Sequence, residues 1–326
     1  MSAPLFRTTL ALSLLLAACA TDDDADPDVE LEAERAAAPD ELDLDVEDGD
    51  PAVDLAPEPE LTMPAGARVI EGAGVRAVAP PPGMSVHASV IFTDGTTSEL
   101  IVSTALDGTV TTRSPEQPPI EEGDAARAGA KGACNDDFWI GLIYEWDHTY
   151  RWALNTGTRP AGLSVAAVEG AVRRATSHIT GASNSCGMKD NVSAAHVYRG
   201  RTKARAGITA GGGCTSNDGR NVTDWGNLPA NVLALTCTWH SGVDAVESDA
   251  RMNKADHAWY VTKPSGCKTR YDIEAVMTHE RGHTYGLADL TVENHPNLTM
   301  RGAIRPCDGR TRTLGKGDVL GLRNKY

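Results

Sequence analysis

The chain has 326 residues and a formal net charge of −15 at pH 7, because 45 Asp and Glu residues outnumber 30 Lys and Arg residues. Only 5% of the residues are aromatic, and the sequence shows neither a basic groove nor a set of aromatic residues for stacking on bases, which argues against a nucleic-acid partner. The length allows one domain with a sizeable core and additional segments.

The first residues predict export. An apolar run from Leu10 to Ala18 is too short to span a bilayer and fits a signal peptide over residues 1–18. The run Leu16-Ala-Ala-Cys19 is typical of a bacterial lipobox, so we expect Cys19 to be lipidated and to attach the mature chain to a membrane. Cleavage after Ala20 is the alternative, because this position also fits a secretory signal. Both predict a location in the cell envelope or on the outer surface, with proteolytic release to the extracellular space as a further option.

An acidic segment follows over residues 19–65. Between Thr21 and Glu60 there are 18 Asp or Glu residues and one basic residue, so this stretch alone carries −17 and the rest of the chain is nearly neutral. Such a composition buries too little apolar area to offset the entropy of ordering. We therefore predict a disordered tether, with a Ca²⁺-binding acidic tail as the alternative.

Residues 66–115 have the pattern of a small β-rich unit. Its expected strands, separated by turn signals such as Asp94-Gly95, are Ser85–Thr93, Ser98–Ser103 and Gly108–Thr112. We interpret the unit as a pro-segment or a spacer, and it contains no cysteine that could cap a metal. Residues 116–133, rich in Pro, Gly, Ala and charge, predict an exposed linker that is open to processing.

Six cysteines remain once Cys19 is set aside as the lipid site. An even number in an exported chain predicts three disulfides, for which fifteen pairings exist. A zinc-capping thiol at Cys134 is the alternative, although it would strand one of the other five. No two cysteines have the close spacing of a four-cysteine zinc site. The six are Cys134, Cys186, Cys214, Cys237, Cys267 and Cys307.

Residues 134–326 are expected to form one domain with alternating strands and helices. Ser164 can cap a helix whose buried face carries apolar residues at steps of three and four, from Val165 to Ile179. A second helix is expected to begin at about Asp272. The predicted strands are Tyr150–Asn155, Ala194–Tyr198, Asn231–Trp239 and Ala245–Asn253.

The run from Thr278 to Asp289 reads Thr-His-Glu-Arg-Gly-His-Thr-Tyr-Gly-Leu-Ala-Asp. On a helix, His279 and His283 project from one face on neighbouring turns, so both rings can bind one Zn²⁺. Glu280 lies beside the first ligand and can act as the general base toward a water activated by the metal. The spacing therefore predicts a catalytic zinc site.

The third ligand is expected to be Asp289. Gly286 can adopt the positive φ with which the chain ends the helix and turns back, and a short turn then brings the Asp289 carboxylate to the metal. His295 is the alternative ligand. A gluzincin-like site with a distant glutamate is less favoured, because Glu293 lies too near in a loop-like stretch.

With this motif the chain resembles the metzincin metalloproteases, and within them the matrixin-like bacterial members, over about residues 134–326. Two further features carry the resemblance. The segment His295-Pro-Asn-Leu-Thr-Met300 looks like a Met-turn, in which Met300 lies beneath the metal, and the last residues to Tyr326 are similar to the C-terminal helix of matrixins. The chain departs from the family in two places: Asp289 replaces the usual histidine, and Gly302 stands where some relatives carry a tyrosine.

The resemblance implies an α+β fold of zincin or metzincin type, with a twisted mixed sheet, an active-site helix and a small C-terminal subdomain after the Met-turn. It also implies a monomeric zinc endopeptidase acting on extended segments of extracellular proteins, with Ala245–Asn253 as the edge strand that pairs with substrate. An amphipathic surface strand is the alternative for that segment.

A non-catalytic surface lipoprotein or binding module that keeps zinc as a structural clip is the alternative function. Glu280 argues against it, because it is not needed to hold the metal. Five further histidines have no ligand spacing and are expected to be structural or at the surface: His148, His178, His196, His240 and His257.

Overall fold

The computed structural model describes residues 58–72, 74–94, 96–113, 131–291 and 294–326. The expected signal peptide, Cys19, most of the acidic tether, most of the linker and Glu293 lie outside these residues. Within the described part of the chain, no helix is long and apolar enough to cross a membrane.

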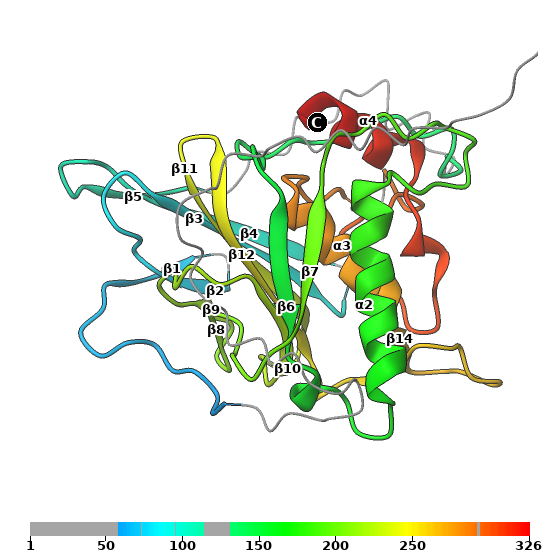
Figure 1. The fold of residues 1–326 in the computed structure, drawn as a ribbon, viewed down its shortest axis with the longest axis horizontal. Coiled ribbons are helices and arrows are strands. Elements are labelled where there is room, and N and C mark those ends of the chain that lie inside the picture. The colour runs from blue at the N-terminus through cyan, green and yellow to red at the C-terminus, as the bar shows by residue number, and fades with distance from the viewer. Residues whose placement is uncertain (1–57, 73, 95, 114–130, 292–293) are drawn as a thin grey trace, which may run out of the picture. The chain divides into compact units, whose positions relative to one another are not determined.

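The fold is α+β and its main element is a mixed sheet of eight strands in the order β5-β4-β3-β11-β12-β10-β6-β7 (Figure 1). Strands β12, β10, β6 and β7 run parallel to one another, whereas β11 is antiparallel to both of its neighbours. The strands are β3 (Ser85–Phe92), β4 (Thr97–Thr104), β5 (Val110–Arg113), β6 (Tyr150–Leu154), β7 (His196–Arg201), β10 (Val222–Gly226), β11 (Val232–Ser241) and β12 (Asp244–Asn253).

Two smaller sheets accompany the main one. The first has the order β1-β2-β9-β8, and the second pairs β13 with β14. Their strands are β1 (Val69–Gly72), β2 (Val75–Val78), β8 (Ile208–Thr209), β9 (Gly213–Cys214), β13 (Ala258–Tyr260) and β14 (Arg270–Asp272).

Helices α2 (Val165–Thr180) and α3 (Ile273–Thr284) cover one face of the sheet, and α4 (Lys316–Lys325) lies near the end of the chain (Figure 1). The predicted cap of the first helix is confirmed, since the Ser164 hydroxyl accepts a hydrogen bond from the Ala167 N–H. One core cluster joins the apolar faces of α2 and α3 to the sheet. Two short 3₁₀ helices complete the fold, at Thr156–Thr158 and Arg310–Arg312.

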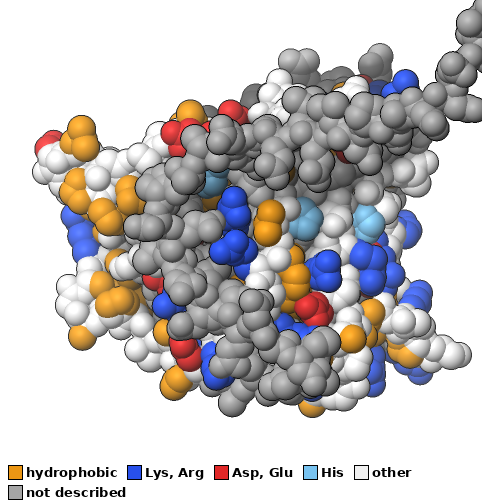
Figure 2. All heavy atoms as spheres, in the orientation of Figure 1, with side chains coloured by type: hydrophobic (Ala, Val, Ile, Leu, Met, Phe, Trp, Pro, Cys, Tyr) orange, Lys and Arg blue, Asp and Glu red, His pale blue; other side chains and the backbone are white. Residues whose placement is uncertain are grey.

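The exposed surface carries few large hydrophobic side chains. On the face shown in Figure 2 they lie scattered among charged and other side chains. Among the described residues, the large hydrophobic side chains with most exposure are Val69, Leu106, Ile143, Val197, Val243 and Val246. The apolar residues are therefore mostly collected inside the fold.

The predicted position of the sheet edge was wrong. Ala245–Asn253 falls in β12, which pairs with β11 on one side and with β10 on the other. The alternative of a surface strand is wrong as well, because most side chains of β12 are buried. Among the strands after residue 134, β11 is the outermost on the side of the sheet where β3, β4 and β5 are added.

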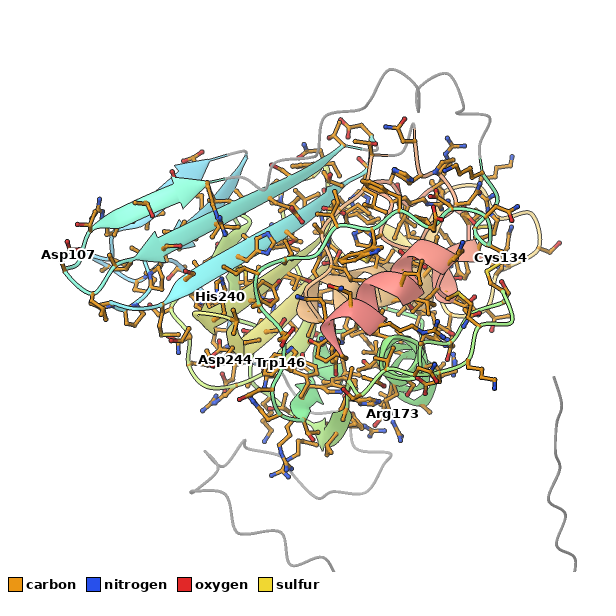
Figure 3. The ribbon with its side chains drawn as sticks, turned by 90° about the horizontal axis from the view of Figure 1, so that it is seen from above. Asp107, Cys134, Trp146, Arg173, His240 and Asp244 are labelled. Carbon is orange, nitrogen blue, oxygen red and sulfur yellow. A yellow bond between two sulfur atoms is a disulfide. The ribbon has the colours of Figure 1, made fainter. Side chains whose placement is uncertain are left out.

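The strands expected between residues 66 and 115 form, and they join the main sheet. Strand β3 pairs with β11 from Phe92 opposite Val232 to Ser85 opposite His240 (Figure 3). A second apolar cluster lies between these strands and the following chain, and it includes Val86, Ala88, Leu235 and Trp239. The described residues 58–113, which we call the N-terminal segment, are thus packed into the domain.

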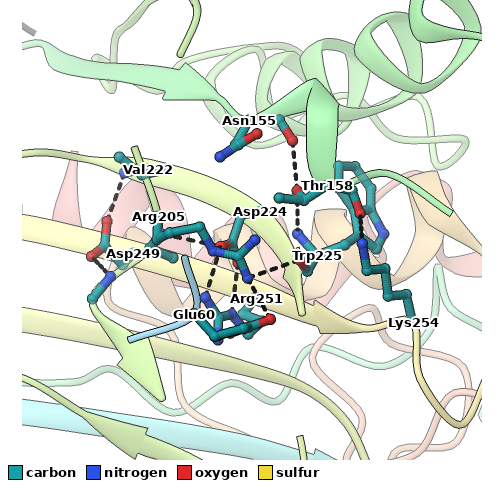
Figure 4. A network of polar contacts seen from close by, with 12 residues as sticks. Glu60, Asn155, Thr158, Arg205, Val222, Asp224, Trp225, Asp249, Arg251 and Lys254 are labelled. Atoms are coloured by element: carbon teal, nitrogen blue, oxygen red, sulfur yellow. Dashed lines mark hydrogen bonds and ion pairs between the residues drawn. The ribbon is translucent and has the colours of Figure 1, made fainter. Parts of the chain in front are cut away.

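Polar side chains are buried on the face of β12 that turns away from α3. Arg251 binds Asp224 through two hydrogen bonds, with Nε to Oδ1 at 2.7 Å and NH2 to Oδ2 at 2.8 Å (Figure 4). Glu60 bridges Arg251 at 2.7 Å and Arg205 at 2.6 Å. The positive charges of Arg205 and Arg251 are thus balanced by the negative charges of Asp224 and Glu60. This pairing offsets the cost of removing the buried groups from water.

Three disulfides are present, as the six cysteines predicted. They join Cys134 to Cys186, Cys214 to Cys237 and Cys267 to Cys307. The alternative of a zinc-capping thiol at Cys134 is therefore wrong. Three disulfides are typical of a protein that folds outside the reducing cytoplasm.

The start of α3 carries a buried carboxylate whose partners predict acid-sensitive stability. Burial would raise the pKa of Glu274, but hydrogen bonds from His178 and Arg174 oppose it and lower the pKa from 4.5 to about 2. Glu274→Gln should therefore reduce the free energy of unfolding at pH 7 by about 2 kcal/mol, a typical loss for hydrogen bonds to charged groups. Because the folded pKa is depressed, this contribution is present above pH 4.5 and disappears as the pH falls toward 2.

Urea unfolding of both proteins between pH 7 and pH 3 measures this difference. Glu71→Gln is the control, since the exposed pair of Glu71 and Arg76 should contribute little at any pH. A Glu274→Gln deficit that stays constant with pH would contradict the assignment.

Candidate metal centre

Helix α3 presents the two histidines of the motif. It begins at Ile273, close to the predicted start, and the carboxylate of the N-cap residue Asp272 accepts hydrogen bonds from the Glu274 and Ala275 N–H groups. The helix ends at Thr284, and Gly286 then adopts a φ of +80°, as predicted for the turn. A side chain at Gly286 would also collide with the Tyr144 carbonyl, because a Cβ there would lie 2.3 Å from it.

The structure brings three predicted ligands together. His279 Nε2 lies 3.1 Å from His283 Nε2 and 3.1 Å from Asp289 Oδ1, and His283 Nε2 lies 3.5 Å from the same oxygen. Among the described residues, these three form the group of side chains that could hold a metal ion. The Asp289 carboxylate thus meets both imidazoles after the short turn at Gly286.

The separations of the three ligand atoms fit a tetrahedral zinc ion. Ligands at about 2.0–2.1 Å from Zn²⁺ in tetrahedral geometry lie about 3.3–3.4 Å apart, which falls within the observed range. Burial would raise the pKa of Asp289 and lower that of His283, but their attraction opposes it: the pKa of Asp289 is lowered and that of His283 is raised to about 9. The pocket therefore favours positive charge beside the carboxylate, as a cation site requires.

Backbone carbonyls orient both imidazoles. His279 Nδ1 lies 3.0 Å from the Thr299 carbonyl oxygen, and His283 Nδ1 lies 2.9 Å from that of Leu287. An N–H at Nδ1 that donates to these oxygens leaves the Nε2 lone pair for a metal. Each ring, when neutral, therefore has the tautomer that a zinc ligand needs.

Asp318, in the first turn of α4, holds the loop that contains Thr299 and Met300. Its carboxylate accepts hydrogen bonds from the backbone N–H groups of Thr299 at 2.8 Å, Met300 at 3.1 Å and Gly315 at 2.8 Å. Because the Thr299 carbonyl faces His279, Asp318 connects the C-terminal helix to a ligand. Asp318 was not among the site residues predicted from the sequence.

Met300 packs directly against α3. A Cβ at Gly282 would lie 2.0 Å from Met300 Sδ and 2.8 Å from its Cε, so only glycine allows this approach. Gly282 lies between His279 and His283 in the sequence, and Met300 therefore supports the helix between the two ligands. That Met300 forms a Met-turn below a metal ion stays a prediction.

Gly282→Ala should destabilise the domain, although alanine usually favours a helix. We expect the free energy of unfolding to fall by about 1–3 kcal/mol, because the added methyl group overpacks the contact with Met300. Urea unfolding measures the change. Gly170→Ala in α2 is the matched control, since a Cβ there meets only the end of the Arg174 side chain at 3.2 Å and should add up to about 1 kcal/mol of stability. Equal effects of the two substitutions would contradict this packing.

Glu280, the predicted general base, is held on one side only. Its Oε2 accepts a hydrogen bond of 2.5 Å from the Thr236 hydroxyl of β11, and its Oε1 has no hydrogen-bond partner among the described residues. Burial raises the pKa of Glu280. One oxygen is therefore held by the sheet while the other remains available to a proton.

The alternative ligand His295 lies in a different environment. Its Nδ1 is 2.9 Å from Asp136 Oδ2, and its ring stacks on Phe138 with 4.3 Å between the centroids. Five of the six remaining histidines, those predicted to be structural or at the surface, have partners outside the metal group: His148 contacts Asp147, His178 contacts Glu274, His196 contacts Trp152, His240 contacts Gly242, and His257 contacts Val232.

Two residues of the N-terminal segment reach the centre, and the sequence analysis missed both. Glu99 Oε1 accepts a hydrogen bond of 3.2 Å from the Asp289 N–H, and His87 lies 3.9 Å from the same oxygen. Burial and the nearby Asp289 raise the pKa of Glu99 to about 8. A single charged residue in the run Ser98-Glu-Leu-Ile-Val-Ser103 was the signal that could have indicated an inward-facing carboxylate.

The centre is closed from solvent in this arrangement. His279 and Glu280 have 0% relative exposure, and His283 and Asp289 have 1%. Tyr144 contributes to the closure, since its hydroxyl donates a hydrogen bond to the His283 carbonyl at 2.8 Å and lies 3.3 Å from His87 Nδ1. Access from solvent to these four side chains therefore needs a rearrangement.

No family model matches this chain, and no curated protein matches its sequence.

Proposed function

We propose that this chain is a zinc endopeptidase of metzincin type that acts outside the cytoplasm on extended segments of proteins. The observation that carries the proposal is the convergence of His279, His283 and Asp289 beside a glutamate with one unoccupied carboxylate oxygen. A purely structural zinc site needs the ligands but does not need Glu280.

The chemistry follows from the positions of the side chains. When bound, Zn²⁺ polarises a scissile carbonyl and lowers the pKa of water toward about 7. Glu280 Oε1 accepts the proton of the attacking water and then delivers it to the departing amine. Thr236 holds Oε2, so the orientation of the carboxylate is fixed while Oε1 stays without a hydrogen-bond partner among the described residues.

The metzincin-like fold is part of this proposal. The twisted mixed sheet, the motif on α3, the packing of Met300 below the ligands and the C-terminal helix α4 all agree with it. The three disulfides support action in the cell envelope or beyond it. Lipidation at Cys19, attachment to a membrane and a monomeric state belong to the same proposal.

A non-catalytic zinc protein is the second candidate, and the burial of the ligands favours it. A non-catalytic site needs no access for a substrate, whereas a catalytic site must let water and substrate reach the fourth coordination position of the zinc. In this structure the four central side chains are almost completely inaccessible. The two candidates differ in whether the centre opens and whether peptide bonds are then hydrolysed.

The deciding experiment uses the full chain, folded oxidatively and loaded with zinc. A recognition sequence for a specific protease, introduced between residues 113 and 131, allows the N-terminal segment to be cut after folding. We expect one zinc per chain, hydrolysis of casein after the cut, loss of activity with a chelator and recovery with added Zn²⁺. One bound zinc without hydrolysis in either form would favour the non-catalytic candidate.

A further inference from the structure

The N-terminal segment occupies the one edge of β11 that the remaining chain leaves available. The strands after residue 134 have the order β11-β12-β10-β6-β7, so β11 would be an edge strand without β3. The edge of a sheet pairs readily with an extended peptide. Strand β3 already fills this position over nearly the whole length of β11.

The pairing places β3 directly beside the proposed base. Ser89 of β3 is opposite Thr236 of β11, whose hydroxyl holds Glu280, and Glu99 of β4 is opposite Ser89 on the other side. Because directly paired residues point to the same face of a sheet, Ser89 and Glu99 face the metal centre together with Thr236. Glu99 then reaches the Asp289 backbone, as its hydrogen bond shows.

The beginning of β4 closes a second side of the centre. A Cβ at Gly302 would lie 2.5 Å from Thr97 Cγ2, so Thr97 occupies the space beside the loop that carries Met300. Gly302 is the position at which the sequence departs from relatives with a tyrosine. Here the N-terminal segment fills the space that a larger side chain would need.

Additional contacts hold the segment in place. Its apolar residues, including Val86, Ala88 and Val90, form a common core with Leu235 and Trp239 of β11. Glu60 adds ion pairs to two buried arginines, as Figure 4 shows. Figure 3 shows the cyan strands of the N-terminal segment beside β11, the strand that ends near His240.

We infer that the N-terminal segment is an intramolecular inhibitor: β3 takes the place of an extended peptide along β11, and β4 seals the metal centre. This inference rests on the proposed function, because it assigns the β11 edge to a peptide substrate. Inhibition here depends on strand pairing and side-chain contacts and needs no cysteine thiol. A substrate binds along β11 only after β3 has left it.

Two measurements on the full zinc-loaded chain test the inference. The first is the rate of casein hydrolysis, and the second is the rate at which the chelator dipicolinate removes zinc, which reports access to the centre without catalysis. Both are compared for the intact chain, the chain cut between residues 113 and 131, and the variant Ala88→Asp. This variant places a charge in the common core and should detach β3 from β11. Thr111→Asp on the exposed strand β5 is the matched control.

We expect the intact chain and Thr111→Asp to hydrolyse casein at less than a hundredth of the rate of Ala88→Asp, and to lose zinc at least ten times more slowly. If Ala88→Asp fails to fold, the cut chain should show the same two increases. Faster zinc removal without hydrolysis would show that the segment closes the metal centre, but it would refute the endopeptidase and with it the role of the segment as an inhibitor. Equal hydrolysis and equal zinc removal in intact and cut chains would overturn the inhibitor and leave the endopeptidase standing.

Discussion

Replacing Glu280 with glutamine is expected to lower kcat/KM for a peptide substrate by about 10²- to 10⁴-fold, while the zinc content stays unchanged. Glutamine keeps the size of the side chain and can still accept the hydrogen bond from Thr236. It cannot take a proton at Oε1, which is the atom without a partner among the described residues. The loss should therefore fall on the chemical step and lower kcat more than it changes KM.

The measurement uses the opened form of the chain, with zinc determined in the same sample. Glu274→Gln is the matched control, because it changes a glutamate on the same helix that pairs with Arg174 and His178 and not with the ligands. The control should lose stability and keep its activity per folded molecule. Equal activity of Glu280→Gln and wild type would rule out the general-base role.

Local sequence patterns predicted most of the individual elements. Ser164 and Asp272 occur at the caps of α2 and α3, where a short polar side chain can accept backbone hydrogen bonds, and both act as caps. Gly286 has the positive φ that its place after the helix predicted. The His279 and His283 rings meet because a spacing of four residues brings side chains to one helix face. All of these follow from interactions within a few residues.

The order of strands in the sheet could not be obtained in this way. Ala245–Asn253 has alternating polar residues, which suggested a strand with a solvent-facing side. In the structure Asp249 and Arg251 are buried on that side, because Asp224 and backbone N–H groups far away in the sequence satisfy them. Alternation records which residues share a face, and it does not reveal whether water or protein covers that face.

The contact of the N-terminal segment with the metal centre could not be predicted from the sequence either. Strands β3 and β11 are separated by about 140 residues, and no local pattern indicates which strands pair across such a distance. Only the structure therefore shows that Glu99 and Thr236 contact residues of the site. The prediction that residues 66–115 are a pro-segment or a spacer stays open, and the pairing with β11 gives it a physical role that can be measured.

Asp289→Ala is expected to reduce zinc affinity by more than about 100-fold, whereas His295→Ala should leave it nearly unchanged. A loss of 10- to 100-fold is typical when only an outer-shell partner of a ligand is removed, and we propose Asp289 as a ligand itself because its carboxylate lies within 3.5 Å of both imidazole Nε2 atoms. His295 instead pairs with the buried carboxylate of Asp136 and stacks on Phe138. Its removal should therefore cost about 1–3 kcal/mol of folding stability without loss of the metal.

Competition with a chelator of known affinity, together with urea unfolding of the zinc-free proteins, separates the two effects. Asp289→Ala should show the larger change in zinc affinity. In the zinc-free state it also relieves the attraction between Asp289 and His283, so the pKa of His283 should fall. His295→Ala should lower the free energy of unfolding, while its zinc affinity stays nearly unchanged. If His295→Ala lost the metal and Asp289→Ala kept it, the third ligand would be His295. The turn at Gly286 would then not serve to bring a ligand to the metal.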